Sequence, residues 1–290
     1  MPKAIFFILG ITCFLSAKSQ LLSDSVLVDG HYRKFHFNKP LPASKDAALV
    51  FILHGSGGTG KQMMKEAIRL ENLSASENIL LVYPDGYKNF WNECRKAASS
   101  AANIENIDEN KFFNLMIGYF KNNYHINSGH VFAAGLSGGG HMAYKLGLTM
   151  PGQFKAITAI VANLPDSSNM DCTASNRPIS VMIINGTNDP VNPYQGGEVR
   201  ITSAYLGTVR STDQTFKYWA SLAGFNGEPE IENLPDTDPS DGKTIVQFSY
   251  KKKRGPEIVL LEVIGGKHDY PNDISTYEYA WAFFKRHFKN

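Results

Sequence analysis

Residues 131–140 read VFAAGLSGGG, an apolar run that leads into a G-x-S-x-G pentapeptide centred on Ser137. The run at 131–136 has the composition of a buried parallel strand, and a helix is expected to begin near Gly140. A serine on a sharp turn between strand and helix takes a strained backbone conformation, so its neighbours must lack Cβ atoms. This stretch therefore predicts an α/β fold that exposes Ser137 at one edge of a parallel sheet.

Predicted strands and helices alternate along the rest of the chain. Further strands are predicted at 25–28, 32–37, 48–53, 79–83, 156–161, 181–184 and 258–264, and helices at 107–122, 212–223 and 274–287. Such alternation indicates a mostly parallel central sheet with helices on both faces. We expect one domain over residues 20–290, with an insertion around 192–242 over one end of the sheet.

The composition is that of a folded protein whose main partner is not a nucleic acid. Hydrophobic residues make up 43% of the 290 residues and charged residues 19%, which allows a sizeable core and excludes wholesale disorder. The net charge is only +2, whereas binding to phosphates requires clustered excess Lys and Arg.

The N-terminus has the pattern of a signal peptide over residues 1–19. Lys3 precedes a short apolar stretch at 4–15 and small residues before Gln20. We therefore expect a protein secreted to the periplasm or outside the cell, without a membrane segment after cleavage, and a monomer. Cys94 and Cys172 remain in the mature chain, and in an oxidising compartment they favour a disulfide over a metal site or two buried free thiols.

Ser137 needs a base and an orienting acid at the same sheet edge. Among eight histidines, His268 directly follows the predicted strand 258–264. Asp189 follows the predicted strand 181–184, whereas Asp166 and Asp171 precede it. The order Ser137, Asp189, His268 is that of α/β-hydrolases, in which serine attacks an acyl carbonyl, histidine transfers its proton and aspartate fixes the imidazole tautomer.

The glycine-rich loop HGSGGTGK at 54–61 permits three interpretations. It contains G-x-G-x-x-G with Asp85 after the next strand, as in a dinucleotide site, and it approaches a phosphate-binding loop that fails at Gln62. We favour an oxyanion loop, in which the backbone N–H groups of Ser56 and Gly138 hold the developing negative charge. No cofactor and no metal is then expected.

Several motifs together carry a family resemblance over nearly the whole mature chain. They are HGSGG at 54–58, YPDG at 83–86, WNEC at 91–94, GLSGGGHMAY at 135–144, GTNDP at 186–190, PYQGG at 193–197 and GKH at 266–268. The chain resembles secreted esterases grouped as polyhydroxybutyrate depolymerase-like and feruloyl or acetylxylan esterases. The resemblance implies the same three catalytic residues and makes Asp85 part of a family loop. Tyr270 stands where members of this family often carry tryptophan.

Four aromatic residues are candidate substrate contacts. Phe90 and Trp91 follow the YPDG motif and are expected beside Ser137, although Trp91 could instead fill the core beneath the loop. Tyr194 and Tyr270 are further candidates implied by the resemblance.

The function predicted first is a secreted serine esterase whose substrate carries a feruloyl or acetyl group on plant polysaccharide. The alternatives are hydrolysis of poly(3-hydroxybutyrate)-type polyesters or their oligomers, and a non-catalytic α/β-hydrolase-like binding protein.

Overall fold

In the part of the chain that the structure describes, six parallel strands form the centre of the sheet. The computed structural model describes residues 21–38, 46–201 and 204–288, so the predicted signal peptide lies outside the described residues. In spatial order the strands are β4 (Ile79–Pro84), β3 (Ala48–Leu53), β5 (Val131–Leu136), β6 (Ala156–Ile160), β7 (Ser180–Gly186) and β12 (Ile258–Ile264). Nearly all of their residues are buried, which explains why the sequence shows continuous apolar runs.

Antiparallel strands extend both edges of this sheet. β2 (His31–Asn38) pairs with β4 and β1 (Leu21–Val28) with β2, while β11 (Thr244–Tyr250) pairs with β12 and β10 (Glu230–Asn233) with β11. Asp29 and Gly30 join β1 to β2, and both have positive φ, 46° and 85°, as a two-residue hairpin turn requires. The mostly parallel sheet predicted from the sequence is confirmed.

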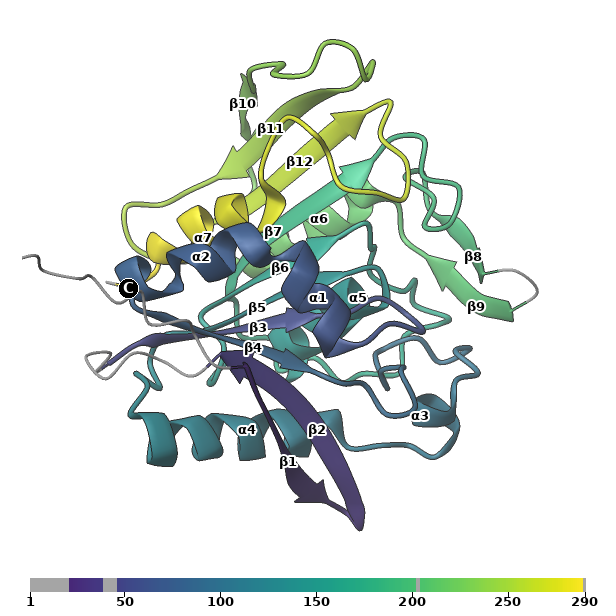
Figure 1. Ribbon diagram of the computed structural model, residues 1–290. Helices are drawn as coiled ribbons and strands as arrows, with labels where there is room; N and C mark the ends of the chain where they lie inside the picture. The colour runs from purple at the N-terminus through teal and green to yellow at the C-terminus, as the bar shows by residue number, and fades with distance from the viewer. Residues whose placement is uncertain (1–20, 39–45, 202–203, 289–290) are drawn as a thin grey trace, which may run out of the picture.

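Helices cover both faces of the sheet (Figure 1). On one face lie α1 (Gly60–Glu66), α2 (Ile68–Glu77) and α7 (Thr276–Lys285), and on the other α4 (Glu109–Tyr124), α5 (Gly138–Thr149) and α6 (Thr212–Leu222). Alternate residues of β3 therefore enter two separate cores, Leu49 and Phe51 on one side and Val50 and Ile52 on the other. None of the helices in the described ranges is long and apolar enough to cross a membrane.

Helix α4 begins at Glu109 rather than at the predicted residue 107. The Asp108 side chain accepts a hydrogen bond from the Lys111 N–H at 2.9 Å, and this cap starts the helix. At the other end His125 takes a left-handed conformation, with φ 51°, and stops it. The helix therefore begins and ends two residues later than the predicted range 107–122.

The carboxyl ends of the parallel strands meet at one edge of the sheet, where the loops that build the site gather. Residues 192–242 do not form a single insertion there. The hairpin of β8 (Gly197–Ile201) and β9 (Ala204–Val209) lies beyond that edge, at the right of Figure 1. The loop between β10 and β11 also reaches this edge, where Lys243 pairs with Asp269 at 3.3 Å. Helix α6 packs on a face of the sheet, and β10 extends its antiparallel edge.

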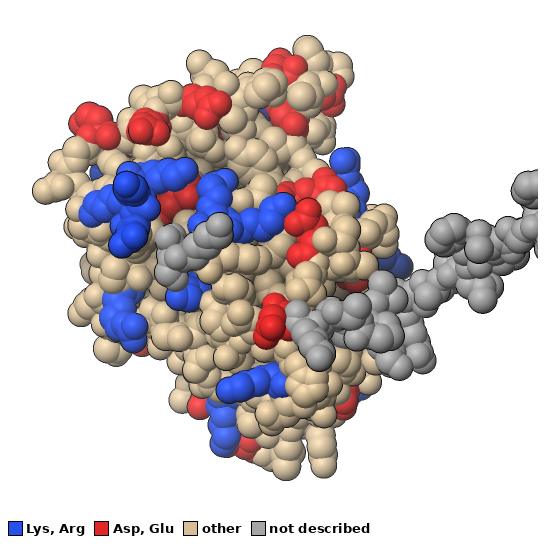
Figure 2. Space-filling model, turned by 90° about the vertical axis from the view of Figure 1, so that its left-hand side faces the viewer, with Lys and Arg blue, Asp and Glu red and all other residues tan. Residues whose placement is uncertain are grey.

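The opposite end of the molecule carries mixed charge. Figure 2 shows the face at the left of Figure 1, where the amino ends of the parallel strands lie, with several basic side chains gathered toward its middle and acidic ones above and beside them. Charges of both signs on this face agree with the net charge of only +2.

Candidate active site

Ser137 occupies a sharp turn between β5 and α5. Its φ and ψ are 52° and −114°, a strained combination for a residue with a side chain. A Cβ atom on Gly135 would lie 2.0 Å from the Gly139 carbonyl oxygen, and one on Gly139 would lie 2.3 Å from the Leu53 carbonyl oxygen. The turn can therefore form only because its neighbours are glycines, as the sequence predicted, and α5 begins at once with Gly138.

The structure brings together the three side chains that the sequence selected. His268, after β12, places Nε2 2.9 Å from Ser137 Oγ and Nδ1 2.7 Å from Asp189 Oδ2. Because the carboxylate accepts a hydrogen bond from Nδ1–H, the proton stays on Nδ1 and Nε2 is left to accept the serine proton. Asp189, after β7, is itself held by the backbone N–H groups of Val191 and Asn192, each 2.8 Å from Oδ1.

The glycine-rich loop after β3 lies directly against the first residue of α5. A Cβ atom built on Gly138 would be 2.9 Å from the Ser56 backbone nitrogen and 2.6 Å from its Oγ. The backbone N–H groups of Ser56 and Gly138 therefore lie close together, with Gly138 at the positive end of a helix. Two neighbouring N–H groups at such a position suit a developing oxyanion.

His54 holds this loop in place, a role that the sequence did not indicate. Its Nε2 accepts a hydrogen bond from the Gly86 N–H at 2.8 Å, so the proton is on Nδ1, which donates to the Gly55 carbonyl at 2.7 Å. Burial lowers the pKa of His54 below its usual 6.5, which keeps the imidazole neutral, as both hydrogen bonds require. His54 thus ties the oxyanion loop to the YPDG turn.

Asp85, the candidate ribose ligand of the dinucleotide interpretation, is engaged within the protein. Oδ1 accepts the Gly60 N–H at the start of α1 at 2.7 Å, and Oδ2 lies 3.1 Å from His36 Nε2. Asp85 therefore anchors the glycine-rich loop from the other side. No cluster of three His, Cys, Asp or Glu side chains placed to hold a metal occurs within residues 21–38, 46–201 and 204–288.

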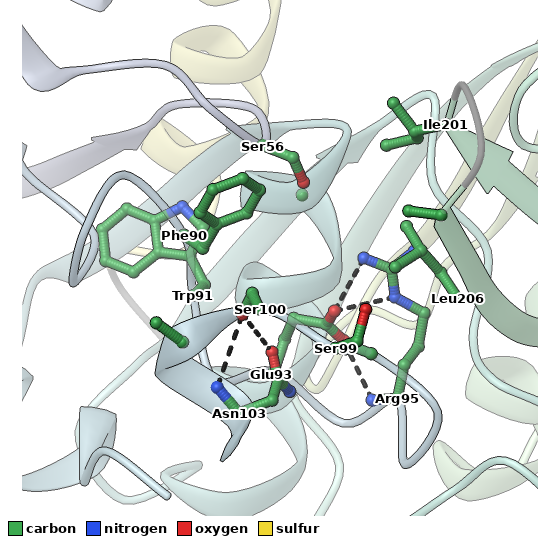
Figure 3. Close-up of a pocket in the computed structure, with 14 residues that line it drawn as sticks. Ser56, Phe90, Trp91, Glu93, Arg95, Ser99, Ser100, Asn103, Ile201 and Leu206 are labelled. Carbon is green, nitrogen blue, oxygen red and sulfur yellow. Dashed lines mark hydrogen bonds and ion pairs between the residues drawn. The ribbon is translucent and has the colours of Figure 1, made fainter. Parts of the chain in front are cut away.

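A cavity of about 450 Å³ opens beside the oxyanion loop (Figure 3). Its apolar walls include Phe90 and Trp91 on one side and Ile201 and Leu206 of the β8–β9 hairpin on another. Polar side chains complete the lining, namely Ser56, Glu93, Arg95, Ser99, Ser100 and Asn103. The sequence indicated Phe90, Trp91 and Ser56 as site residues but not Glu93 and Arg95, which only the folded loop brings to the cavity.

Trp91 belongs both to the hydrophobic core and to the wall of the cavity. Its side chain is buried, and its indole N–H donates to the His54 carbonyl oxygen at 2.9 Å. Its ring lies 4.8 Å from the His54 ring and 6.2 Å from that of Phe113, measured between centroids. Trp91 therefore supports the oxyanion loop from beneath while its edge forms part of the cavity wall. Phe90, by contrast, is exposed to 36%.

The structure does not bring Tyr194 and Tyr270 into this cavity. The Tyr194 hydroxyl hydrogen-bonds the Glu262 carboxylate. The Tyr270 hydroxyl bonds Glu66 at 2.5 Å and Tyr277 at 2.8 Å, beside α1 and α7. Neither residue lines the cavity next to Ser56 and Gly138, so both stay predictions as substrate contacts.

The predicted disulfide is confirmed. Cys94 and Cys172 are bonded, with their Cα atoms 5.1 Å apart, and they join the loop after β4 to the loop after β6. The Lys96 N–H donates to the Asn169 carbonyl at 2.7 Å next to this bridge. The bridge therefore fixes one wall of the cavity.

A model of the phospholipase/carboxylesterase family matches residues 40–223. The chain belongs to this family. It is also 23% identical over 269 residues to NocK of Nocardia uniformis subsp. tsuyamanensis, a protein to which esterase activity is ascribed, covering 88% of this chain and 75% of NocK. Feruloyl esterase C of Emericella nidulans is 26% identical over 162 residues, a match that spans about half of each chain, 53%.

Among solved structures, an acetyl xylan esterase from Aspergillus awamori has a similar fold. The TM-score is 0.64 at 16% sequence identity, over 91% of this chain and 99% of that one. The predicted α/β-hydrolase fold is therefore confirmed. Together with the family match, it identifies the protein as a carboxylic ester hydrolase.

Proposed function

We propose that the protein is a secreted serine esterase that releases feruloyl or acetyl groups from plant polysaccharide through an acyl-enzyme on Ser137. The observation that carries this proposal is the hydrogen-bonded series Ser137–His268–Asp189 beside two adjacent backbone N–H groups. A serine with an imidazole at 2.9 Å favours an activated nucleophile, and the nearness of Ser56 to Gly138 supports an oxyanion site made by their N–H groups.

The geometry supports the following reaction. Ser137 Oγ attacks the ester carbonyl carbon while its proton passes to His268 Nε2, and the carbonyl oxygen becomes an oxyanion held by the N–H groups of Ser56 and Gly138. The intermediate collapses, and the departing alcohol takes the proton from His268. Water then attacks the acyl carbon and gives a proton to His268, which returns it to Ser137 as the acid leaves. Asp189 keeps the imidazole in the required tautomer throughout.

The similar proteins and the disulfide support the polysaccharide substrate and the secretion, respectively. Feruloyl esterase C is similar to this chain in sequence, and the acetyl xylan esterase is similar in fold. The names of these two proteins specify feruloyl and acetyl groups, respectively. The Cys94–Cys172 bridge fits an oxidising compartment, in which disulfides form and persist. Both agree with the signal peptide predicted at 1–19.

Replacement of the nucleophile tests the mechanism. Ser137→Ala is expected to remain folded and to lose a factor of about 10⁶ in kcat on nitrophenyl acetate, because the three residues act as a unit. Asp189→Asn is expected to lose about 10⁴, through the wrong tautomer of His268. Ser76→Ala, a serine exposed on α2, is the matched control and should keep wild-type activity. A Ser137→Ala enzyme with a tenth of the wild-type activity would remove Ser137 from the mechanism.

A release assay tests the substrate. The wild type is incubated with methyl ferulate, acetylated xylan and hydroxybutyrate oligomers, and the freed acids are quantified. We expect ferulate or acetate release to exceed that of hydroxybutyrate. Hydrolysis of the hydroxybutyrate oligomers alone would overturn the polysaccharide assignment, and binding without release of any acid would favour the non-catalytic alternative.

A further inference from the structure

The cavity beside the oxyanion loop contains a buried ion pair that the mechanism above does not use. Glu93 and Arg95 both line the cavity, and their side chains are only 3% and 4% exposed. They flank Cys94, which forms the disulfide with Cys172, and both charged side chains line the cavity (Figure 3). A buried pair of this kind adds little net stability compared with apolar residues, so its presence calls for another reason.

The hydrogen bonds of the pair leave one donor group of Arg95 uncommitted. Nε donates to Glu93 Oε1 at 2.7 Å, Nη2 forms an ion pair with the same oxygen at 2.6 Å, and Glu93 Oε2 accepts the Arg95 backbone N–H at 2.9 Å. No acceptor for Nη1 occurs among residues 21–38, 46–201 and 204–288. Nη1 is also not sealed within protein, in contrast to Nη1 of the structural Arg33. Because Arg95 lines the cavity, the N–H groups of Nη1 are available to an acceptor bound there.

Two features hold Arg95 in a fixed position. The neighbouring disulfide joins Cys94 to Cys172, and backbone hydrogen bonds follow on both sides, with the Asp171 N–H donating to the Cys94 carbonyl at 3.2 Å. Glu93 holds the guanidinium itself. A donor that is already oriented loses little side-chain entropy when it binds a ligand, and so discriminates well between ligands.

The cavity lies on the acyl side of the reacting ester. Its lining includes both oxyanion residues, Ser56 and Gly138, but not His268. Since His268 must protonate the departing alcohol, the alcohol lies near His268 and the acyl group extends the other way. Between the oxyanion loop and Arg95 the acyl group would pass Phe90 and Trp91 on one side and the β8–β9 hairpin on the other (Figure 3).

We propose that Arg95 is a specificity-determining residue, whose Nη1 donates a hydrogen bond to an oxygen substituent at the far end of an aromatic acyl group. This inference rests on the proposed serine esterase function and narrows its substrate. The aromatic and aliphatic walls suit a flat ring, and the polar end suits its oxygen substituents. Because Glu93 already neutralises Arg95, a neutral hydroxyl or methoxy oxygen is preferred to a carboxylate. An acetyl group would reach neither the ring-binding walls nor Arg95.

Two esters that differ only in the ring test the proposal on the wild-type enzyme. Methyl ferulate carries hydroxyl and methoxy groups on its ring, and methyl cinnamate carries none. A hydrogen bond from a charged donor in a desolvated site should raise kcat/KM for the ferulate by on the order of tenfold to a hundredfold over the cinnamate. A ratio below twofold in the wild type would overturn the proposal without any variant.

Two variants then assign the preference to Arg95. Arg95→Lys keeps the charge beside Glu93 but loses the forked donor, and Glu93→Gln with Arg95→Gln replaces the ion pair by a neutral one. In both, the ratio of ferulate to cinnamate should fall about tenfold. Arg200→Gln is the matched control, since Arg200 also pairs with a glutamate two residues earlier, Glu198 at 2.9 Å, but on the exposed surface of β8. It should leave the ratio unchanged.

A binding measurement separates substrate recognition from turnover. In the Ser137→Ala background, quenching of tryptophan fluorescence gives Kd for the two esters, and Arg95→Lys should weaken ferulate binding alone by about tenfold. Folded Arg95 variants that keep the wild-type ratio would overturn the proposal. If the wild type hydrolyses nitrophenyl acetate through Ser137 but does not prefer ferulate, Arg95 loses its role while the serine esterase stands. If Ser137→Ala retains full activity, the esterase mechanism itself fails.

Discussion

Replacing Trp91 by alanine should affect stability and turnover together. The change removes a side chain only 3% exposed, its ring contacts with His54 and Phe113 and its 2.9 Å hydrogen bond to the His54 carbonyl. Truncation of a buried tryptophan costs about 3–5 kcal/mol of unfolding free energy, so the melting temperature should fall by about 6–20 °C. Since His54 positions the loop that carries Ser56, weakened oxyanion binding should also lower kcat by about tenfold or more.

Two further variants separate these effects. Trp281→Ala removes an equally buried tryptophan, 2% exposed, from helix α7, away from the cavity. The indole N–H of Trp281 donates to Glu77 of α2 at 2.9 Å. This variant should lower the melting temperature by a similar amount and leave kcat of the folded enzyme unchanged. Phe90→Ala removes an exposed cavity residue and should barely change melting, while kcat/KM falls more for methyl ferulate than for nitrophenyl acetate.

The assay combines thermal melting with steady-state kinetics on nitrophenyl acetate and methyl ferulate, well below the melting temperature of each variant. The acetyl ester is informative because its small acyl group cannot reach the far wall of the cavity. If Trp91→Ala has the melting temperature of the wild type and hydrolyses only methyl ferulate more slowly, Trp91 acts only as a wall of the substrate cavity. The reasoning about the oxyanion loop would then be refuted.

Two further predictions concern stability. Replacing Cys94 and Cys172 by serine removes a cross-link between residues 78 apart in sequence, and the chain-entropy model predicts a loss of about 4–5 kcal/mol of unfolding free energy. An unchanged midpoint in urea unfolding of this variant would contradict the prediction. Two free thiols titrated in the denatured, unreduced wild-type protein would contradict the disulfide itself. Burial lowers the pKa of His54, His141 and His287, to about 4 for His287, so the unfolded chain takes up protons below pH 6.5 that the native state refuses. Stability should therefore fall as the pH drops from about 6.5 toward 4, and a melting temperature that holds level over this range would show that these histidines do not control it.

Although it did not predict the antiparallel strands β8 to β11, the local sequence was sufficient for the parallel strands, the serine turn and the order of the three reacting groups. Each of these depends on neighbouring residues: apolar runs make buried strands, and the glycines around Ser137 are the only residues that fit its turn. Since the carboxyl ends of parallel strands meet at one edge, placing Asp189 and His268 after their strands was enough to predict that they lie near Ser137. The sequence also predicted the disulfide, because only two cysteines lie outside the predicted signal peptide.

The walls of the cavity depended on contacts between distant segments. No local pattern distinguishes the Glu93–Arg95 pair from surface charges such as Glu198 and Arg200, which have the same spacing. The first pair is buried because the disulfide to Cys172 and the β8–β9 hairpin enclose it, and both come from far along the chain. In irregular loops the direction of a side chain follows from such long-range packing rather than from a backbone period. For this reason the sequence could place the reacting groups, whereas only the tertiary structure decided what surrounds the acyl group.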